Sequence, residues 1–401
     1  MVAQTSQQIK RTKATFAGRQ AHLRPEGAYE VMARSQELEA KGHSIVHLEA
    51  GEPDFNAPPN AALAGIEAIA SGQTRYVPPA GLTKLREIIA DTAGKRRGIS
   101  FNAKQVLIAP GAKPVMFFPT LTLVEPGDEV IYPDPGFPTY EAMLLVAGAV
   151  PKPVPLLESN SFSFDLDAFD RLVNDRTRLI ILNSPSNPTG GVIPLEDLQH
   201  IAEAARRYDS WIMSDEIYTQ IVFDGQTAPS IASLPGMAER TIIVDGFSKT
   251  YAMHGWRLGY GIMPEPLAER VRLFFTHGFG CTAQASQIAA IEALTGPQDH
   301  VAMMVEQYQK RREIIVEGLN KLRGIHCQKP QGAFYAFPNI QRTGKSSQEI
   351  ANLFLDYGVA LLPGSAFGKY GEGYLRLSYA NSIPNIQLAL ERMGKALKTL
   401  N

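Results

Sequence analysis

From about residue 100 onward, short apolar runs alternate with segments that suit helices. The runs cover residues 105–109, 129–133, 178–182, 211–214, 241–244 and 258–262. Runs that are apolar almost throughout are typical of strands buried on both faces, and parallel strands need crossover connections. Residues 194–208 fit such a connection, because apolar side chains recur there at helical spacing and charges fill the other face. The pattern predicts an α/β domain built on a mostly parallel sheet.

The pattern changes after Pro297. A long, charged stretch at residues 301–323 favours a helix, and shorter strand candidates follow around residues 332–337 and 374–379. This order predicts a second, smaller α+β domain. The residues before Pro58 lack the parallel-sheet pattern, so we assign 1–57 to an N-terminal arm and part of the small domain. The predicted large domain is then 58–297, and the predicted C-terminal small domain is 298–401.

Composition narrows the class of partner. The 401 residues include 39 Lys plus Arg and 40 Asp plus Glu, a net charge of −1, which disfavours nucleic acid or an anionic membrane as the main partner. No apolar stretch approaches the roughly 18 uncharged residues of a membrane-spanning helix. The two cysteines, Cys281 and Cys327, form no CxxC motif, so neither a disulfide framework nor a zinc site is expected. A small-molecule ligand and a cytoplasmic location fit these observations.

The first 25 residues carry five basic side chains and no acidic one. Three interpretations stay open for this segment: a solvated arm, an arm that lies across a partner subunit, and an organellar transit peptide.

Polar residues follow four of the predicted strands. Residues 183–190 (NSPSNPTG) follow one strand, residues 214–218 (SDEIY) end the next, 246–249 (GFSK) end another, and 111–113 (GAK) follow the first. Ligands of open parallel sheets bind beyond the carboxyl ends of the strands, so an amide, a carboxylate, a phenol and an amine should converge there. This set suits a cofactor that forms a Schiff base with lysine, needs a protonated ring nitrogen and carries a phosphate. Pyridoxal phosphate is the candidate.

The stretch 246–259 (GFSKTYAMHGWRLG) resembles the cofactor-lysine signature of class I/II pyridoxal-phosphate-dependent aminotransferases of fold type I. Similar stretches run in the family's order from 49–55 (EAGEPDF) to 374–380 (YLRLSYA). The resemblance is to the prokaryotic-type aspartate aminotransferase subgroup. It implies a large domain with a mostly parallel, seven-stranded type of sheet covered by helices, a smaller α+β domain, and a homodimer with shared active sites.

The resemblance implies roles for the residues at the strand ends. Lys249 would hold the cofactor and move the substrate proton as general acid and base, and Asp215 would pair with the ring nitrogen. Tyr218 and Asn187 would donate to the phenolic oxygen of the ring. The alternatives are a solvated lysine, a helix-capping aspartate and an asparagine that merely belongs to a turn.

A second group would hold the phosphate. The fork of Arg257 would grip it, the backbone N–H groups of Gly111, Ala112 and Lys113 at a helix start would cradle it, and Ser248 would add a hydroxyl.

Three further positions bear on the cofactor site. Many family members carry serine or threonine where this chain has Gly246, which puts one phosphate contact in doubt. Phe137 resembles the aromatic residue that stacks on the pyridine ring, although an ordinary core phenylalanine is the alternative. Tyr76 resembles the tyrosine that reaches the cofactor phosphate of the neighbouring subunit.

Arg376 lies in an apolar, strand-like run, where its charge calls for a ligand carboxylate or a buried acid. The resemblance implies the substrate α-carboxylate, assisted by the Asn187 amide and the Gly51 backbone, and a structural ion pair is the alternative. Lys113 corresponds to a lysine that some aspartate-using relatives place near the distal carboxylate. Cys281 and Thr282 fall near the cofactor in relatives, but we assign them no role.

We therefore expect a transaminase that works by a ping-pong cycle on an L-amino acid and a 2-oxo acid, first of all aspartate with 2-oxoglutarate. Alanine or aromatic donors are alternatives, and a carbon–sulfur β-lyase of the same fold is another. A transcription regulator that carries this domain is disfavoured, because the short arm leaves no room for a DNA-binding unit and the net charge is near neutral.

Overall fold

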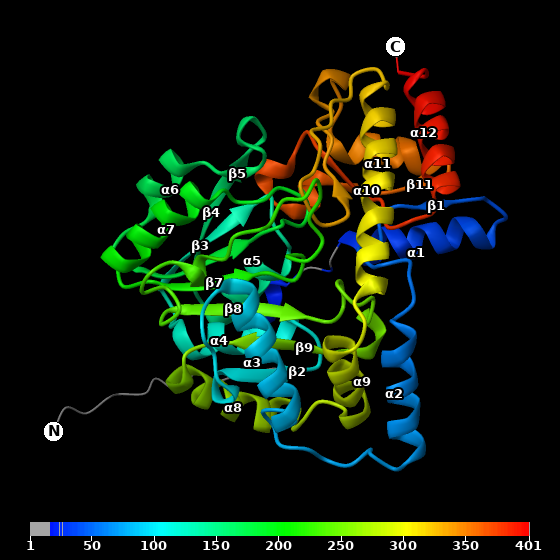
Figure 1. Ribbon diagram of the computed structural model, residues 1–401. Helices are drawn as coiled ribbons and strands as arrows, with labels where there is room; N and C mark the ends of the chain where they lie inside the picture. Colours follow the sequence, from blue (N-terminus) through cyan, green and yellow to red (C-terminus); the bar gives the residue numbers. More distant parts are fainter. Residues whose placement is uncertain (1–16, 24, 26, 401) are drawn as a thin grey trace, which may run out of the picture.

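A large mixed sheet forms the centre of the computed structural model, and helices cover both of its faces (Figure 1). The structure describes residues 17–23, 25 and 27–400. The basic residues Lys10, Arg11, Lys13 and Arg24 of the predicted arm lie outside the described residues.

The sheet has the strand order β2-β9-β8-β7-β6-β3-β4-β5. Strands β8, β7, β6, β3 and β4 pair in parallel, while β9 runs antiparallel to both of its neighbours and β5 runs antiparallel to β4. The prediction of a mostly parallel sheet is confirmed, and the short β5 extends the expected seven strands at one edge. Its strands are β2 (Val106–Ala109), β3 (Glu129–Asp134), β4 (Val150–Leu157), β5 (Ser163–Phe164), β6 (Thr177–Asn183), β7 (Trp211–Asp215), β8 (Thr241–Gly246) and β9 (Gly259–Ile262).

Strand alternation divides the apolar side chains between two cores. In β6, Leu179 and Ile181 pack on one face, while Ile180 and Leu182 pack on the other. The first face is covered by α4 (Lys113–Leu123), α5 (Thr139–Ala147) and α8 (Glu265–Gly278). The second face is covered by α3 (Thr83–Arg97), α6 (Leu166–Leu172), α7 (Leu195–Arg207) and α9 (Gln284–Thr295). Helix α2 (Pro59–Ala70) packs against α9. Both faces are therefore apolar, which explains the unbroken apolar runs of the sequence.

The predicted crossover helix at residues 194–208 is confirmed as α7. Its buried side chains recur at helical spacing, and acidic residues in its first turn and arginines in its last turn complement the helix dipole.

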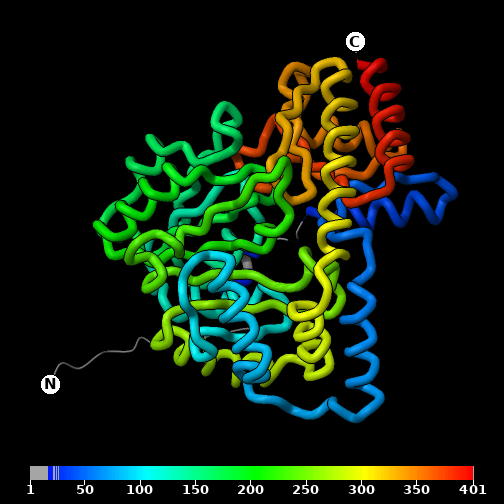
Figure 2. Tube along the Cα trace, viewed as in Figure 1, coloured from blue at the N-terminus to red at the C-terminus, as the bar shows by residue number. Residues whose placement is uncertain are grey.

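Helix α10 (Asp299–Asn320) leads from the large sheet into a smaller unit, as the yellow segment of Figure 2 shows. This unit holds the antiparallel sheet β10-β13-β12 and a parallel pair in which Val46 of β1 lies opposite Val359 of β11. The N-terminal segment thus joins the C-terminal unit, although the exact boundaries 57/58 and 297/298 stay a prediction. The remaining elements of the smaller unit are α1 (Gly27–Ala40), β1 (Val46–His47), β10 (Tyr335–Ala336), α11 (Ser347–Asp356), β11 (Val359–Ala360), β12 (Leu362–Pro363), β13 (Leu375–Ser378) and α12 (Ile383–Leu397).

Short 3-10 helices connect several of these elements. They are η1 (Gly18–His22), η2 (Ala103–Gln105), η3 (Glu158–Asn160), η4 (Ile231–Ser233), η5 (His254–Trp256), η6 (Gln341–Thr343), η7 (Gly364–Phe367) and η8 (Lys369–Gly371). Over the described residues, none of the helices is both long enough and apolar enough to cross a membrane.

Candidate active site

The predicted site residues lie at the carboxyl ends of neighbouring strands. Asp215 is the last residue of β7, Asn183 the last of β6 and Gly246 the last of β8, while Gly111 follows β2 by two residues. Strands β8, β7 and β6 are adjacent and parallel, so their ends share one edge of the sheet. The site was predicted at this edge because ligands of open parallel sheets bind beyond the carboxyl ends of the strands.

The Lys249 amine is placed for nucleophilic chemistry. It lies in the turn after β8, where its Nζ donates a hydrogen bond of 2.5 Å to the Gly51 carbonyl and lies 5.8 Å from the Phe334 ring centre. Burial lowers the pKa of this amine to about 8, while the nearby Glu52 carboxylate opposes the shift. An amine with a lowered pKa is more often neutral and able to attack a carbonyl carbon. Lys249 is therefore not a solvated surface lysine.

The Asp215 carboxyl is buried beside Lys249's turn. The Tyr140 hydroxyl donates to its Oδ2 at 2.7 Å, and the Ile217 N–H donates to its Oδ1 at 3.3 Å. Burial raises the pKa of this carboxyl to about 6, and the Asp245 and Glu216 carboxylates add to the rise. The Ile217 contact resembles a cap, but such a carboxyl is also disposed to pair with a cation.

Tyr140 was missed by the sequence interpretation. The sequence offered one signal for it, the three-residue spacing from Phe137, because residues three apart in a turn or helix lie side by side. In the structure the Tyr140 N–H donates to the Phe137 carbonyl at 3.0 Å, and the two rings meet edge-on with their centres 5.8 Å apart.

Two asparagines tie the loop after β6 to the site. Asn183 accepts from the Asn187 backbone at 2.8 Å and donates to the Asp215 carbonyl at 3.1 Å. The Asn187 side-chain oxygen then accepts from Nη1 of Arg376 at 3.5 Å. Asn187 thus contacts Arg376, which is 189 positions away in the chain, as well as preceding Pro188 in the loop.

Arg376 is buried in β13 with its guanidinium among polar and aromatic groups. Nη2 donates to the Glu49 carbonyl, and the guanidinium carbon lies 4.8 Å from the Tyr335 ring centre and 5.1 Å from that of Phe367. A Cβ added at Gly51 would lie 3.5 Å from Nη1, so the Gly51 backbone passes close to this side chain. The structure brings together Arg376, Asn187 and Gly51, the three groups predicted to bind a carboxylate.

The turn after β2 packs closely against the Arg257 side chain and the start of β9. Gly111 has a φ of +92°, and a Cβ there would lie 3.1 Å from the guanidinium carbon of Arg257. A Cβ at Gly259 would lie 2.7 Å from the Ala112 nitrogen, so both glycines permit a close approach of the backbone. Ala112 precedes α4 without a side-chain cap, which leaves the helix start for another acceptor.

Gly246 has no room for the hydroxyl that many family members carry. A Cβ at this position would lie 2.9 Å from the Gly259 Cα, because β8 and β9 pair directly there. Ser248, which is partly exposed beside Lys249, offers a hydroxyl two residues further along the chain.

The aromatic residues predicted for the site, Phe137, Tyr218 and Tyr76, differ in burial and contacts. Phe137 is partly buried at the margin of a core cluster, and Lys113 Nζ lies 5.4 Å from its ring centre. Tyr218 is buried, with its hydroxyl 2.7 Å from that of Tyr335, a residue that the sequence interpretation missed. Tyr76 is 97 % exposed in the single chain.

Cys281 and Thr282, to which no role was assigned, have few described side-chain contacts. Thr282 donates to the Ile108 carbonyl at 3.4 Å, and the thiol of Cys281 is free.

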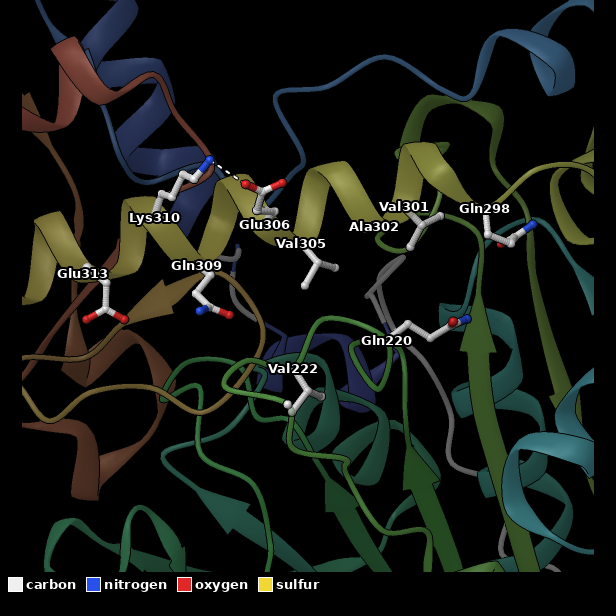
Figure 3. Close-up of a pocket in the computed structure, with 11 residues that line it drawn as sticks. Gln220, Val222, Gln298, Val301, Ala302, Val305, Glu306, Gln309, Lys310 and Glu313 are labelled. Carbon is white, nitrogen blue, oxygen red and sulfur yellow. Dashed lines mark hydrogen bonds and ion pairs between the residues drawn. The ribbon is translucent and has the colours of Figure 1, made fainter.

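A hollow of about 800 Å³ lies elsewhere, between α10 and residues 220–225 (Figure 3). Val222, Val301 and Val305 extend into the same space there, and Lys310 pairs with Glu306 on its rim. None of the predicted site residues lines it. The site is therefore identified by the chemistry of its side chains and not by the size of a hollow.

The strand-end site has the groups that pyridoxal phosphate requires. It offers a cradle for an anion, a buried carboxyl with a raised pKa and an amine with a lowered pKa. The described residues contain no group of three or more His, Cys, Asp or Glu side chains that could hold a metal ion.

Known aminotransferases resemble this chain over most of its length. The family model "Aminotransferase class I and II" matches residues 43–393. The chain is 40 % identical over 358 residues to aromatic-amino-acid aminotransferase 2 of Thermococcus litoralis, covering 88 % of this chain and 92 % of that one. It is 39 % identical over 358 residues to an aspartate aminotransferase of Pyrococcus abyssi, with the same coverage.

A solved structure of aspartate aminotransferase from Thermus thermophilus with maleate superposes with a TM-score of 0.92. The two chains are 34 % identical, and the match covers 96 % of this chain and 100 % of the other. This chain therefore belongs to the class I and II aminotransferases and is a pyridoxal-phosphate-dependent enzyme of fold type I.

Proposed function

We propose that this aminotransferase exchanges amino groups between an acidic L-amino acid, first of all aspartate, and 2-oxoglutarate. The observation that carries its chemistry is the pairing of two oppositely shifted groups in one site, the Lys249 amine with a pKa of about 8 and the Asp215 carboxyl with a pKa of about 6. The relatives named for aspartate and for aromatic amino acids support both donor classes.

Residues of this chain would hold the cofactor at three points. Arg257 and the backbone of Gly111, Ala112 and Lys113 at the start of α4 would bind the phosphate, with Ser248 beside them. Asp215 would hold a proton on the ring nitrogen, Tyr218 and Asn187 would donate to the phenolic oxygen, and Phe137 would cover the ring face. When bound, pyridoxal phosphate supplies the electron sink that stabilises negative charge at the substrate Cα.

The remaining steps belong to the protein. Lys249 Nζ, neutral in part at pH 8, accepts the Cα proton and returns it, as a general base and then a general acid. The planar fork of Arg376 binds the α-carboxylate with two parallel hydrogen bonds, and Asn187 and the Gly51 backbone complete that contact. Buried phenols and aromatic rings around these groups keep out water.

We also propose a homodimer with shared sites. Tyr76 is 97 % exposed, and Leu63, Ile66 and Ile69 form an exposed apolar face on α2 at three-residue spacing. Apolar faces of this kind are usually covered by a partner. A second copy of the chain would cover them, with the partner's Tyr76 at the cofactor phosphate. A cytoplasmic location is proposed as well, supported by the free thiols of Cys281 and Cys327.

The substrate proposal is tested by Lys113→Ala. If the Lys113 ammonium meets the distal carboxylate, kcat/KM for aspartate and glutamate should fall about 10- to 150-fold, the loss of a charge-assisted hydrogen bond of about 1.5–3 kcal/mol. Alanine should be used as before.

Lys104→Ala is the matched control, since Lys104 is an exposed lysine before β2. Equal losses for aspartate and alanine would contradict the acidic-substrate assignment. Release of a 2-oxo acid and ammonia without any amino acceptor would instead identify the carbon–sulfur lyase class.

A further inference from the structure

Tyr335 belongs to the smaller unit, yet its side chain reaches the strand-end site. It is 1 % exposed in β10, which pairs antiparallel with β13 so that Tyr335 lies opposite Ser378. Arg376 is two residues from Ser378 and therefore projects from the same face of the small sheet. Its guanidinium carbon lies 4.8 Å from the Tyr335 ring centre, within the range of a cation–π contact.

The hydroxyl of Tyr335 lies near two other groups of the candidate site, the Tyr218 hydroxyl and the Gly51 carbonyl. It lies 2.7 Å from the Tyr218 hydroxyl and 3.4 Å from the Gly51 carbonyl oxygen, the same oxygen that accepts from Lys249. A Cβ at Gly51 would lie only 2.7 Å from this hydroxyl. Position 51 thus leaves space for the phenol because it is a glycine.

The Tyr335 hydroxyl has two acceptors within reach, the Tyr218 oxygen at 2.7 Å and the Gly51 carbonyl oxygen at 3.4 Å, and the shorter contact favours Tyr218. Each phenol has one hydrogen to donate. If Tyr218 uses its hydrogen on the phenolic oxygen of the cofactor, a hydrogen bond between the two phenols has Tyr335 as its donor. A phenol that accepts a hydrogen bond also becomes a better donor, because linked hydrogen bonds polarise one another.

We propose that Tyr335 is a positioning residue for the transamination reaction: its ring supports Arg376, and its hydroxyl donates to Tyr218. It would thereby connect Arg376, the proposed substrate-binding residue of the smaller unit, with Tyr218, the phenol of the large unit that is proposed to contact the cofactor. This inference rests on the proposed roles of Tyr218 and Arg376, and it gives Tyr335 two separable contributions, one from the ring and one from the hydroxyl.

Two substitutions in the holoenzyme separate these contributions. Tyr335→Phe removes only the hydroxyl, so kcat should fall about 3- to 10-fold while KM for the amino acid changes less than twofold. The pH midpoint of the cofactor absorption change should rise by about half to one unit, because weaker donation from Tyr218 disfavours negative charge on the ring oxygen. Tyr335→Leu removes the ring too and should also raise KM about 3- to 10-fold.

Tyr379→Phe is the matched control. Tyr379 is likewise a fully buried tyrosine of the small unit, but its hydroxyl donates only to the Ala333 carbonyl at 3.3 Å among the contacts described. This variant should leave the absorption midpoint unchanged, whatever it does to stability. A Tyr335→Phe enzyme with the same midpoint and kinetic constants as the Tyr379→Phe enzyme would overturn the proposal.

A double-mutant cycle with Tyr218→Phe gives a second test. If the two hydroxyls act through one another, the double variant should have nearly the midpoint of Tyr218→Phe alone, whereas additive shifts would overturn the inference. The proposed function is tested separately by the single variants Tyr218→Phe and Arg376→Lys. If Tyr218→Phe leaves the absorption midpoint unchanged and Arg376→Lys leaves KM unchanged, the assigned roles and the inference fail together. If these two variants show the expected changes but Tyr335→Phe does not, only the inference fails.

Discussion

The substitution Gly111→Ala tests the proposed phosphate site by filling the space between Gly111 and Arg257. Gly111 has a φ of +92°, and a Cβ there would lie 3.1 Å from the guanidinium carbon of Arg257 and closer still to Nη2. The backbone angle alone should cost about 1–2 kcal/mol in the free energy of unfolding. The guanidinium must also move away from the start of α4, which should weaken its contact with a phosphate.

The expected loss of affinity follows from the contact that is removed. A hydrogen bond to a charged group contributes about 1.5–3 kcal/mol, and each 1.4 kcal/mol is a tenfold change in dissociation constant. Gly111→Ala should therefore raise the dissociation constant of the cofactor about 10- to 150-fold. Pyridoxamine 5′-phosphate is the appropriate ligand, because it lacks the aldehyde and cannot form a covalent bond with Lys249. Its binding to cofactor-free protein can be followed by fluorescence.

Gly127→Ala is a closely matched control. Gly127 has a φ of +98°, but a Cβ there would meet nothing within 4 Å. Both variants should lose similar stability in denaturant unfolding, and only Gly111→Ala should lose affinity for the ligand. Dissociation constants within threefold of one another would refute the placement of the phosphate between Arg257 and α4.

Two further predictions concern charge and assembly. Because burial holds the pKa of Asp215 near 6, above the ordinary 3.8, the folded apoprotein loses stability as the pH rises from about 4 through 6. Asp215→Asn should then raise the free energy of unfolding of the apoprotein at pH 7 by up to about 3 kcal/mol, with no gain at pH 4. The kcat of the holoenzyme should fall by orders of magnitude. Equal effects on stability at both pH values would contradict this reasoning. Ile66→Glu on α2 should yield monomers with little activity in sedimentation experiments, whereas Leu388→Glu on α12 should not; an unaltered dimer for both would contradict the proposed interface.

The sequence was most informative where local chemistry decides structure. The apolar run at 211–214 predicted β7, and the strand ends directed attention to Asp215 and Lys249, because buried parallel strands leave polar residues only at their ends. The strand candidate at 332–337 was less well bounded, since only Tyr335–Ala336 forms a strand in a small, irregular sheet.

The missed site residues depend on contacts between distant parts of the chain. Tyr140 reaches Asp215 across 75 positions, and Tyr335 reaches Tyr218 across 117. Neither contact has a local pattern, because each arises only when a helix or strand packs against another element. A buried tyrosine in an apolar run is indistinguishable from a core residue until the partner of its hydroxyl is known.

The central claim is that Lys249 carries the cofactor, and borohydride reduction of the holoenzyme tests it most directly. The purified protein should absorb in the visible range, and reduction should abolish that band while fixing one phosphopyridoxyl group per chain. Peptide mapping by mass spectrometry should locate the group on Lys249, and Lys249→Ala should bind cofactor without becoming labelled. A label on Lys113 or on another lysine, or a protein that incorporates none after incubation with pyridoxal phosphate, would contradict the account.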